Sequence, residues 1–135
     1  MQTRALVATW PTGCASSHGI PAIDEARALL FAGCSSARTV VLDLARDGKE
    51  LGSFTLGTGA TILAYSPRVG HLYVRGDPGT AIAILAVPDA GSLTLLGQLE
   101  TTPKGHCMTA DDRGQLWVCD WREGKILRFK DPYPP

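Results

Sequence analysis

The chain has 135 residues, which is enough for one domain with a hydrophobic core of its own. Thirteen Lys and Arg residues balance thirteen Asp and Glu residues, so the charge indicates no nucleic-acid partner and no membrane partner. No apolar run approaches the roughly 20 residues of a membrane-spanning helix, and the leading residues lack an apolar stretch of signal-peptide length. We expect a soluble cytoplasmic protein, or a periplasmic or secreted one if the chain is a fragment of a longer parent.

The cysteines bear on the compartment and on metal binding. There are four of them: Cys14, Cys34, Cys107 and Cys119. An even number would allow two disulfides, but no pair has the C-x-x-C spacing that is typical of metal sites. We expect reduced thiols in strands or loops.

The predicted elements begin with a strand at residues 4–10, an apolar run that ends at Pro11. Short apolar runs then recur with a period of roughly 42 to 45 residues. The first repeat, residues 18–56, contains runs at 22–24, 29–31, 39–44 and 51–54. The second repeat, residues 60–99, contains runs at 64–66, 70–74, 81–87 and 95–99. The third repeat, residues 106–130, contains only the runs 109–111, 114–118 and 125–129.

These runs are predicted to be β-strands because they are short, rich in Val, Ile, Leu and aromatic residues, and bounded by turn residues. Asp47-Gly48, Asp112-Arg113-Gly114 and Glu123-Gly124 lie between runs, where tight hairpins need residues that tolerate a positive φ. Four strands joined by short turns form an antiparallel meander. A stack of such meanders at this period predicts an all-β fold, a β-propeller with three four-stranded blades per chain.

Two segments carry a family resemblance. Residues 106–120, followed by Lys125–Phe129, resemble an NHL-type repeat. Ala28–Cys34, followed by Val40–Leu44, resembles a YVTN-type repeat. Both families are β-propellers, so the resemblance implies the same fold, but it implies no particular activity because such repeats serve enzymes and binding scaffolds alike.

The third repeat lacks its outermost strand. The predicted strand at residues 4–10 precedes the inner strand of the first repeat, just as the outer strand at 95–99 precedes the inner strand of the third repeat. Closed propellers have roughly four to eight blades, so three blades leave two faces and a strand edge uncovered. We expect the partner to be the chain itself, in a homodimer that closes a six-bladed ring. A truncated longer propeller is the alternative.

Candidate ligand-binding residues lie on the loops that this topology places around the channel mouth: His18, Thr61, Arg75, His106, Asp120 and Trp121. His18 and His106 open equivalent inner strands, where imidazoles could contact a ligand, bind a metal or simply hydrogen-bond the backbone. An exposed indole at Trp121 would offer a large contact area at low entropic cost, although it could instead pack on the neighbouring blade. Trp117 aligns with Phe31 and Tyr73 and is predicted to be core, whereas His71 is predicted to be a solvated turn residue.

The leading functional hypothesis is a non-enzymatic binding or scaffold propeller that recognises a small ligand or peptide at the channel mouth. In this hypothesis the chain has no catalytic residues, no metal and no cofactor. The alternative is a lyase or hydrolase that uses the channel histidines, with or without a metal. The two differ in whether a His106→Ala variant keeps its function.

Overall fold

The computed structural model describes residues 4–135 and contains eleven strands and one 3₁₀ turn, with no α-helix in that range. The strands are β1 (Ser17–Asp24), β2 (Leu29–Cys34), β3 (Arg38–Asp43), β4 (Lys49–Thr55), β5 (Ala60–Ser66), β6 (His71–Asp77), β7 (Ala81–Ala86), β8 (Thr94–Glu100), β9 (Met108–Ala110), β10 (Gln115–Asp120) and β11 (Lys125–Lys130). The 3₁₀ turn η1 spans Leu44–Arg46. Among the described residues, no helix is long and apolar enough to span a membrane.

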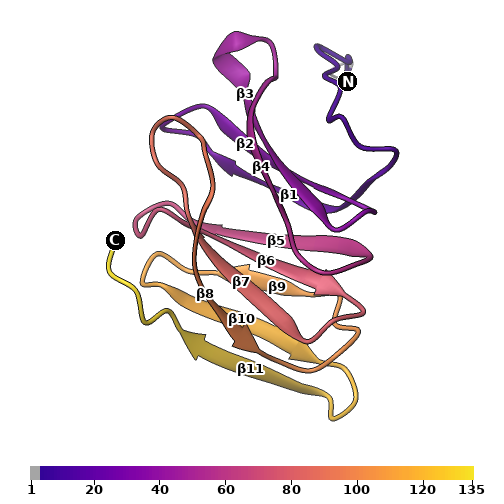
Figure 1. The fold of residues 1–135 in the computed structure, drawn as a ribbon, viewed down its shortest axis with the longest axis vertical. Coiled ribbons are helices and arrows are strands. Elements are labelled where there is room, and N and C mark those ends of the chain that lie inside the picture. Colours follow the sequence, from indigo (N-terminus) through magenta and orange to yellow (C-terminus); the bar gives the residue numbers. More distant parts are fainter. Residues whose placement is uncertain (1–3) are drawn as a thin grey trace.

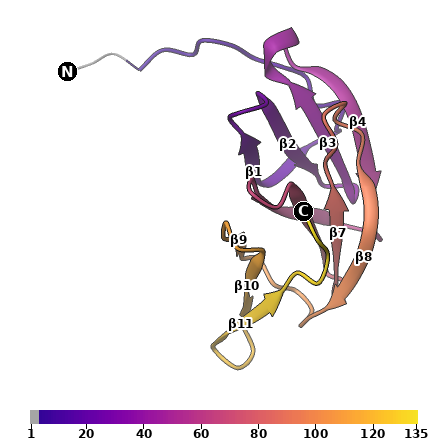
Figure 2. The ribbon, with the colours of Figure 1, turned by 90° about the vertical axis from the view of Figure 1, so that its left-hand side faces the viewer.

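The strands form three antiparallel meanders, here called blade 1 (β1–β4), blade 2 (β5–β8) and blade 3 (β9–β11). The first two have four strands each and the third has three, as the sequence repeats predict. Figure 1 shows the blades stacked along the long axis of the molecule, and Figure 2 shows the inner strands β1 and β9 on one side with the outer strands β4 and β8 on the other. The predicted all-β architecture is confirmed.

Local sequence explains why the repeats share one geometry. Asp47 and Gly48 adopt left-handed φ angles of 53° and 71° in the turn between β3 and β4, which is the conformation that an Asp-Gly pair tolerates best. The ladder between third and fourth strands is interrupted at the same place in both complete blades, after Val41 in blade 1 and after Ile84 in blade 2. Such shared irregularities are structural features of the repeat rather than accidents of one blade.

Two hydrophobic cores fill the seams between the blades. In the first seam Phe31 is fully buried, and its ring centroid lies 4.8 Å from that of Tyr65 on the neighbouring blade. In the second seam Tyr73 packs with Leu116 and Val118 of blade 3. Each seam thus depends on an aromatic side chain from the second strand of one blade that packs against the next blade.

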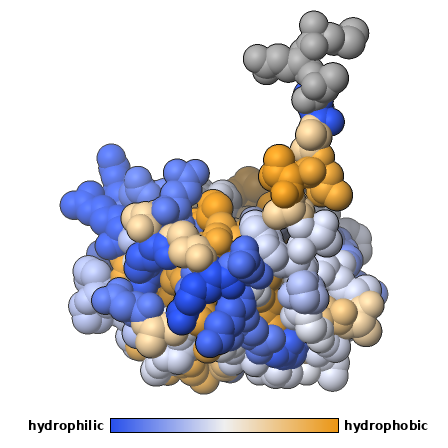
Figure 3. All heavy atoms as spheres, turned by 90° about the horizontal axis from the view of Figure 1, so that it is seen from above, coloured by the Kyte–Doolittle hydropathy of each residue, from blue (hydrophilic) through white to orange (hydrophobic). Residues whose placement is uncertain are grey.

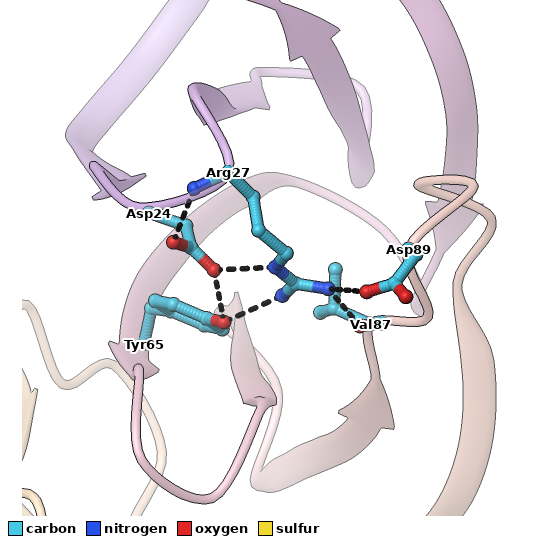
Figure 4. A network of polar contacts seen from close by, with 5 residues as sticks. All are labelled: Asp24, Arg27, Tyr65, Val87 and Asp89. Atoms are coloured by element: carbon cyan, nitrogen blue, oxygen red, sulfur yellow. Dashed lines mark hydrogen bonds and ion pairs between the residues drawn. The ribbon is translucent and has the colours of Figure 1, made fainter.

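A polar network closes the first seam at the end opposite to the β2–β3 turn (Figure 4). The Tyr65 hydroxyl donates to Asp24 Oδ2 at 2.6 Å, and Arg27 donates to Asp24, to the Tyr65 oxygen and to the carbonyl of Val87 at 2.7 Å each. Burial opposes ionisation of Asp24, but the hydrogen bonds from Tyr65 and Arg27 outweigh it and lower the pKa of this carboxyl. The network fixes blade 1 to blade 2 through the buried Asp24 and Tyr65 and the half-buried Arg27.

The second seam has a comparable network at the same end. Asp131 Oδ2 accepts a hydrogen bond from the Tyr73 hydroxyl at 2.7 Å and lies 2.6 Å from His71 Nδ1. The His71 side chain is buried, so the prediction of a solvated turn residue was wrong. The histidine does begin its strand, as predicted, but the residues that follow β11 fold back over it.

The cysteines are paired, so the prediction of reduced thiols was wrong. Disulfides join Cys14 to Cys34 and Cys107 to Cys119, with Cα atoms 5.5 Å apart in each pair. Both join the segment that enters an inner strand to the second strand of the same blade, which antiparallel pairing places within disulfide reach. The linear spacing of the cysteines does not reveal this proximity.

The leading segment does not form a strand in the single chain. Residues 4–10 make no ladder, although the ring of Trp10 lies against Gly48 at the β3–β4 turn. We expected residues 4–10 to pair as a strand with another copy of the chain. A single copy does not test this prediction.

Candidate ligand-binding face

The candidate site is the mouth face, which comprises the turns after β2, β6 and β10 (residues 35–37, 78–80 and 121–124) and the connections that precede β1, β5 and β9 (residues 11–16, 56–59 and 101–107). All six segments lie at one end of the blades because consecutive strands alternate in direction. The six predicted site residues all lie at this end, but the structure exposes only some of them.

Trp121 is the most prominent exposed group of the mouth face. Its side chain lies on the β10–β11 turn with 56% of its surface exposed, and its indole Nε1 donates to the carbonyl of Pro103 at 3.0 Å. The guanidinium of Arg122 lies 5.6 Å from the ring centroid, within cation–π range. The indole is therefore fixed at its polar edge and leaves much of its apolar surface open to a ligand.

Asp120 shapes the turn that presents this indole. Its carboxylate is buried, and Oδ1 accepts hydrogen bonds from the backbone amides of Arg122 and Glu123 at 3.1 and 3.3 Å. An Asx turn of this kind leaves Asp120 with a positioning role. The structure places Asp120 beneath the exposed surface of the turn, and its predicted contact with a ligand is untested.

His106 and Asp77 form a second polar feature across the seam between blades 2 and 3. His106 Nδ1 lies 3.7 Å from Asp77 Oδ2, and 68% of the imidazole surface is exposed. This separation exceeds hydrogen-bonding distance, so the pair is a loose electrostatic contact. The sequence analysis selected His106 but not Asp77, although Asp77 lies only two residues after the selected Arg75.

Arg75 and Thr61 are buried in the described structure, where both make contacts within the protein, and their predicted contact with a ligand is untested. Arg75 donates through Nη2 to the carbonyl of Thr102, and burial lowers the pKa of its guanidinium, an effect that Asp77 partly opposes. A side chain at Gly105 would collide with that guanidinium. Arg75 thus positions the 101–107 connection, while Thr61 packs against Gly33 in the first seam.

His18 is exposed on β1, where its backbone pairs with Gly33 of β2, and its imidazole makes no hydrogen bond or ion pair within residues 4–135. Across the same part of the chain, no group of three or more His, Cys, Asp or Glu side chains is arranged to hold a metal ion. The two predicted channel histidines therefore lie on separate blades and do not belong to a common metal-binding group among the described residues. Ligand binding by His18, His106 and Trp121 stays a prediction.

Comparisons with known proteins give the fold but no family. No protein-family model matches the chain, and no curated protein matches it significantly. Among solved structures, a chain of the mitotic checkpoint complex superposes with a TM-score of 0.69 at 16% identity over 85% of this chain and 36% of that one. The Myceliophteria thermophila Cps50 (Swd1) β-propeller domain gives a TM-score of 0.62 at 12% identity over 84% of this chain and 40% of that one.

BamB from Moraxella catarrhalis superposes with a TM-score of 0.50 at 16% identity over 84% of this chain and 38% of that one. The chain thus spans less than half the length of these neighbours. None of these comparisons tests the YVTN or NHL subtype. Its sheets and its structural neighbours together show that the chain has the fold of a partial β-propeller, with two four-stranded blades followed by a three-stranded one.

Proposed function

We propose that the chain is a non-enzymatic binding module that recognises a small ligand or peptide on its mouth face, with Trp121 as the main contact. The observation that carries the proposal is the Trp121 indole, which is exposed on its apolar surface and anchored at Nε1 by Pro103. A rigid aromatic surface gives large contact area with little loss of side-chain entropy on binding. Partial propellers provide such loop surfaces on a stable scaffold.

The charges beside Trp121 suggest the chemistry of the ligand. Lys104 follows Pro103 directly and Arg122 follows Trp121, and neither cation forms an ion pair among the described residues. By contrast, the nearby acid Glu123 is paired with Lys125. The Asp120 carboxylate is buried and held by backbone amides, so the exposed charge beside the indole that lacks an ion-pair partner is positive. This favours a ligand that combines an aromatic or aliphatic group with a carboxylate.

The test uses the indole N–H signals in ¹⁵N-edited NMR spectra, with N-acetylphenylalanine as the probe and its uncharged amide as the matched control. We expect the acid to shift the Trp121 signal at millimolar concentration, the affinity that suits a single small contact. The amide should bind several-fold more weakly, because it lacks the charge that Lys104 and Arg122 attract.

Two variants complete this experiment. Trp121→Ala removes the Trp121 indole signal and should also abolish the shifts that the acid causes in all other signals. Leu95→Ala, on the outer strand β8, should leave the shift of the Trp121 signal unchanged. The proposal would be contradicted if neither probe shifts the Trp121 signal. It would also be contradicted if the other signals shift equally in the wild-type and Trp121→Ala proteins.

The lyase or hydrolase alternative receives no support from a specific contact. The His106 imidazole has only the loose contact with Asp77, and the His18 imidazole lies on another blade without a hydrogen bond or ion pair among the described residues. General acid–base catalysis needs groups held within hydrogen-bond reach of the proton that they transfer. We therefore do not propose catalysis for these histidines.

The disulfides support an oxidising compartment as the place where this module works, rather than the cytoplasm. Both pairs join adjacent segments within one blade, and reduced cytosolic conditions would not maintain them. Alkylation of the denatured, unreduced protein isolated from its native cells tests this. We expect no labelled cysteine, and labelling of all four would contradict the assignment.

A further inference from the structure

The molecule has two open flanks, one on blade 1 and one on blade 3. Phe31, Tyr73 and Trp117 hold equivalent register positions in the second strands, opposite Ala22, Ala64 and Thr109 of the inner strands. Phe31 and Tyr73 are fully buried because each packs on the following blade. Trp117 is only half-buried, so the prediction that it is core was only partly right. The Arg128 guanidinium lies 5.8 Å from the centroid of the Trp117 ring, and within residues 4–135 no further blade packs on this side of blade 3.

The flank of blade 1 has the complementary position. Tyr65 is the inner-strand residue on which Phe31 packs, and it pairs in register with Leu72. Ile23 is its equivalent in blade 1, where it pairs with Leu30. Ile23 is 46% exposed, although a large aliphatic side chain at this register position would be expected to pack against a preceding blade. Blade 3 thus presents a half-buried aromatic side chain on its outer flank. Blade 1 presents the exposed Ile23 beside a buried apolar cluster on the same face, which comprises Ala32, Cys34, Val40 and Leu42.

The strand edges show the same complementarity. In blades 1 and 2 the third strand pairs with a fourth, β3 with β4 and β7 with β8. In blade 3 the third strand, β11, is the edge of its sheet within the described residues. An edge of this kind can accept a further strand from another chain.

The leading segment has the properties of that further strand. Leu6 and Val7 are 87% and 94% exposed, and the segment projects away from the blades (Figure 2), where its apolar surface is visible from above (Figure 3). It precedes the inner strand of blade 1 as β8 precedes the inner strand of blade 3. An isolated chain gains nothing from exposing these two aliphatic side chains to water.

We propose that a second copy of this chain covers both flanks, with residues 4–10 of each copy adding a fourth strand to β11 of the other. In this assembly Trp117 of one copy packs on Ile23 of the other, which continues the blade-to-blade packing already present twice within the chain. A two-fold arrangement satisfies both flanks at once and closes six blades into a ring, so association stops at the dimer. The proposed contact at Trp121 does not depend on this assembly, because Trp121, Pro103, Lys104 and Arg122 belong to blade 3 and to the connection between blades 2 and 3.

Sedimentation velocity over a range of protein concentrations tests the proposal. We expect the wild-type chain to sediment as a dimer, and a variant carrying Leu6→Asp and Val7→Asp to sediment as a monomer with at least tenfold weaker association. The two substitutions lie on an exposed segment, so the variant should keep the wild-type circular dichroism spectrum. Leu95→Asp, on the outer strand of blade 2, is the control and should stay dimeric.

Hydrogen exchange distinguishes strand addition from packing of the flanks alone. The amides of residues 4–10 should become protected as the concentration rises, in parallel with dimer formation. A monomer at all concentrations, an open-ended series of oligomers, or a dimer in which these amides exchange freely would each overturn the proposal.

Discussion

Replacing Phe31 by Ala would test whether the aromatic seam holds blade 1 to blade 2. The ring is fully buried and 4.8 Å from Tyr65 between centroids, so its removal leaves a cavity that two rigid sheets can only partly close. Truncation of a buried Phe to Ala costs about 3–5 kcal/mol of unfolding free energy. We expect a loss of about 4 kcal/mol, which corresponds to a fall of roughly 10–20 °C in Tm for a domain of this size.

Urea denaturation followed by far-ultraviolet circular dichroism measures this loss, at one low protein concentration so that association contributes equally to each variant. Leu95→Ala provides the control, because Leu95 is also a large apolar residue of a strand but is 46% exposed. The control should lose about 1 kcal/mol or less. A loss below about 1 kcal/mol for Phe31→Ala would refute the view that blade stacking stabilises the fold.

Three further predictions concern the seams and the disulfides. The lowered pKa of Asp24 means that its stabilising contribution is present above about pH 3.8 and is lost as the pH falls through the folded-state pKa, so Asp24→Asn should flatten the acid branch of the stability curve. Burial raises the pKa of Tyr65 to about 12, so its contribution is present below pH 10 and is lost between pH 10 and about 12; alkaline titration of Tyr65→Phe should show a smaller loss than the wild type. Replacing Cys107 and Cys119 together by Ser opens a loop of 12 residues and should cost about 3 kcal/mol, and an unchanged denaturation midpoint would argue against that disulfide.

The fold was predictable because the repeat makes every local signal agree. Apolar alternation, Gly-containing turns and a constant period all indicate meanders, and the observed strands match the predicted runs closely, for instance β6 at His71–Asp77 against the run 70–74. That blade 3 has three strands within residues 4–135 was also predictable, because its repeat contains only three apolar runs in these residues. Strands that are buried at regular intervals along the chain produce apolar runs at the same intervals in the sequence.

The site was less predictable because exposure at a loop depends on contacts that are distant in sequence. Arg75 and Asp120 stood out as charged residues near turns, but Arg75 reaches the carbonyl of Thr102 across a seam, and Asp120 turns inward to its own hairpin. The burial of His71 likewise depends on Asp131, 60 residues away. No local pattern specifies which turn residue faces water and which is covered by a neighbouring blade.

The disulfides escaped prediction for a related reason. Cys119 and Cys107 become neighbours only through antiparallel pairing of β9 and β10, and the backbone amide of Cys119 donates to the carbonyl of Cys107 at 3.3 Å. This proximity follows from the register of the hairpin, in which Ala110 lies opposite Leu116. Counting spacings along the chain, by contrast, tests only for metal motifs.

Small-angle X-ray scattering of the wild-type chain tests most directly whether the two open flanks cover one another. The account predicts a forward-scattering mass of two chains and a distance distribution that fits a closed six-bladed ring with a central channel. A mass of one chain, with a distribution that fits a single stack of three blades and a projecting leading segment, would contradict it.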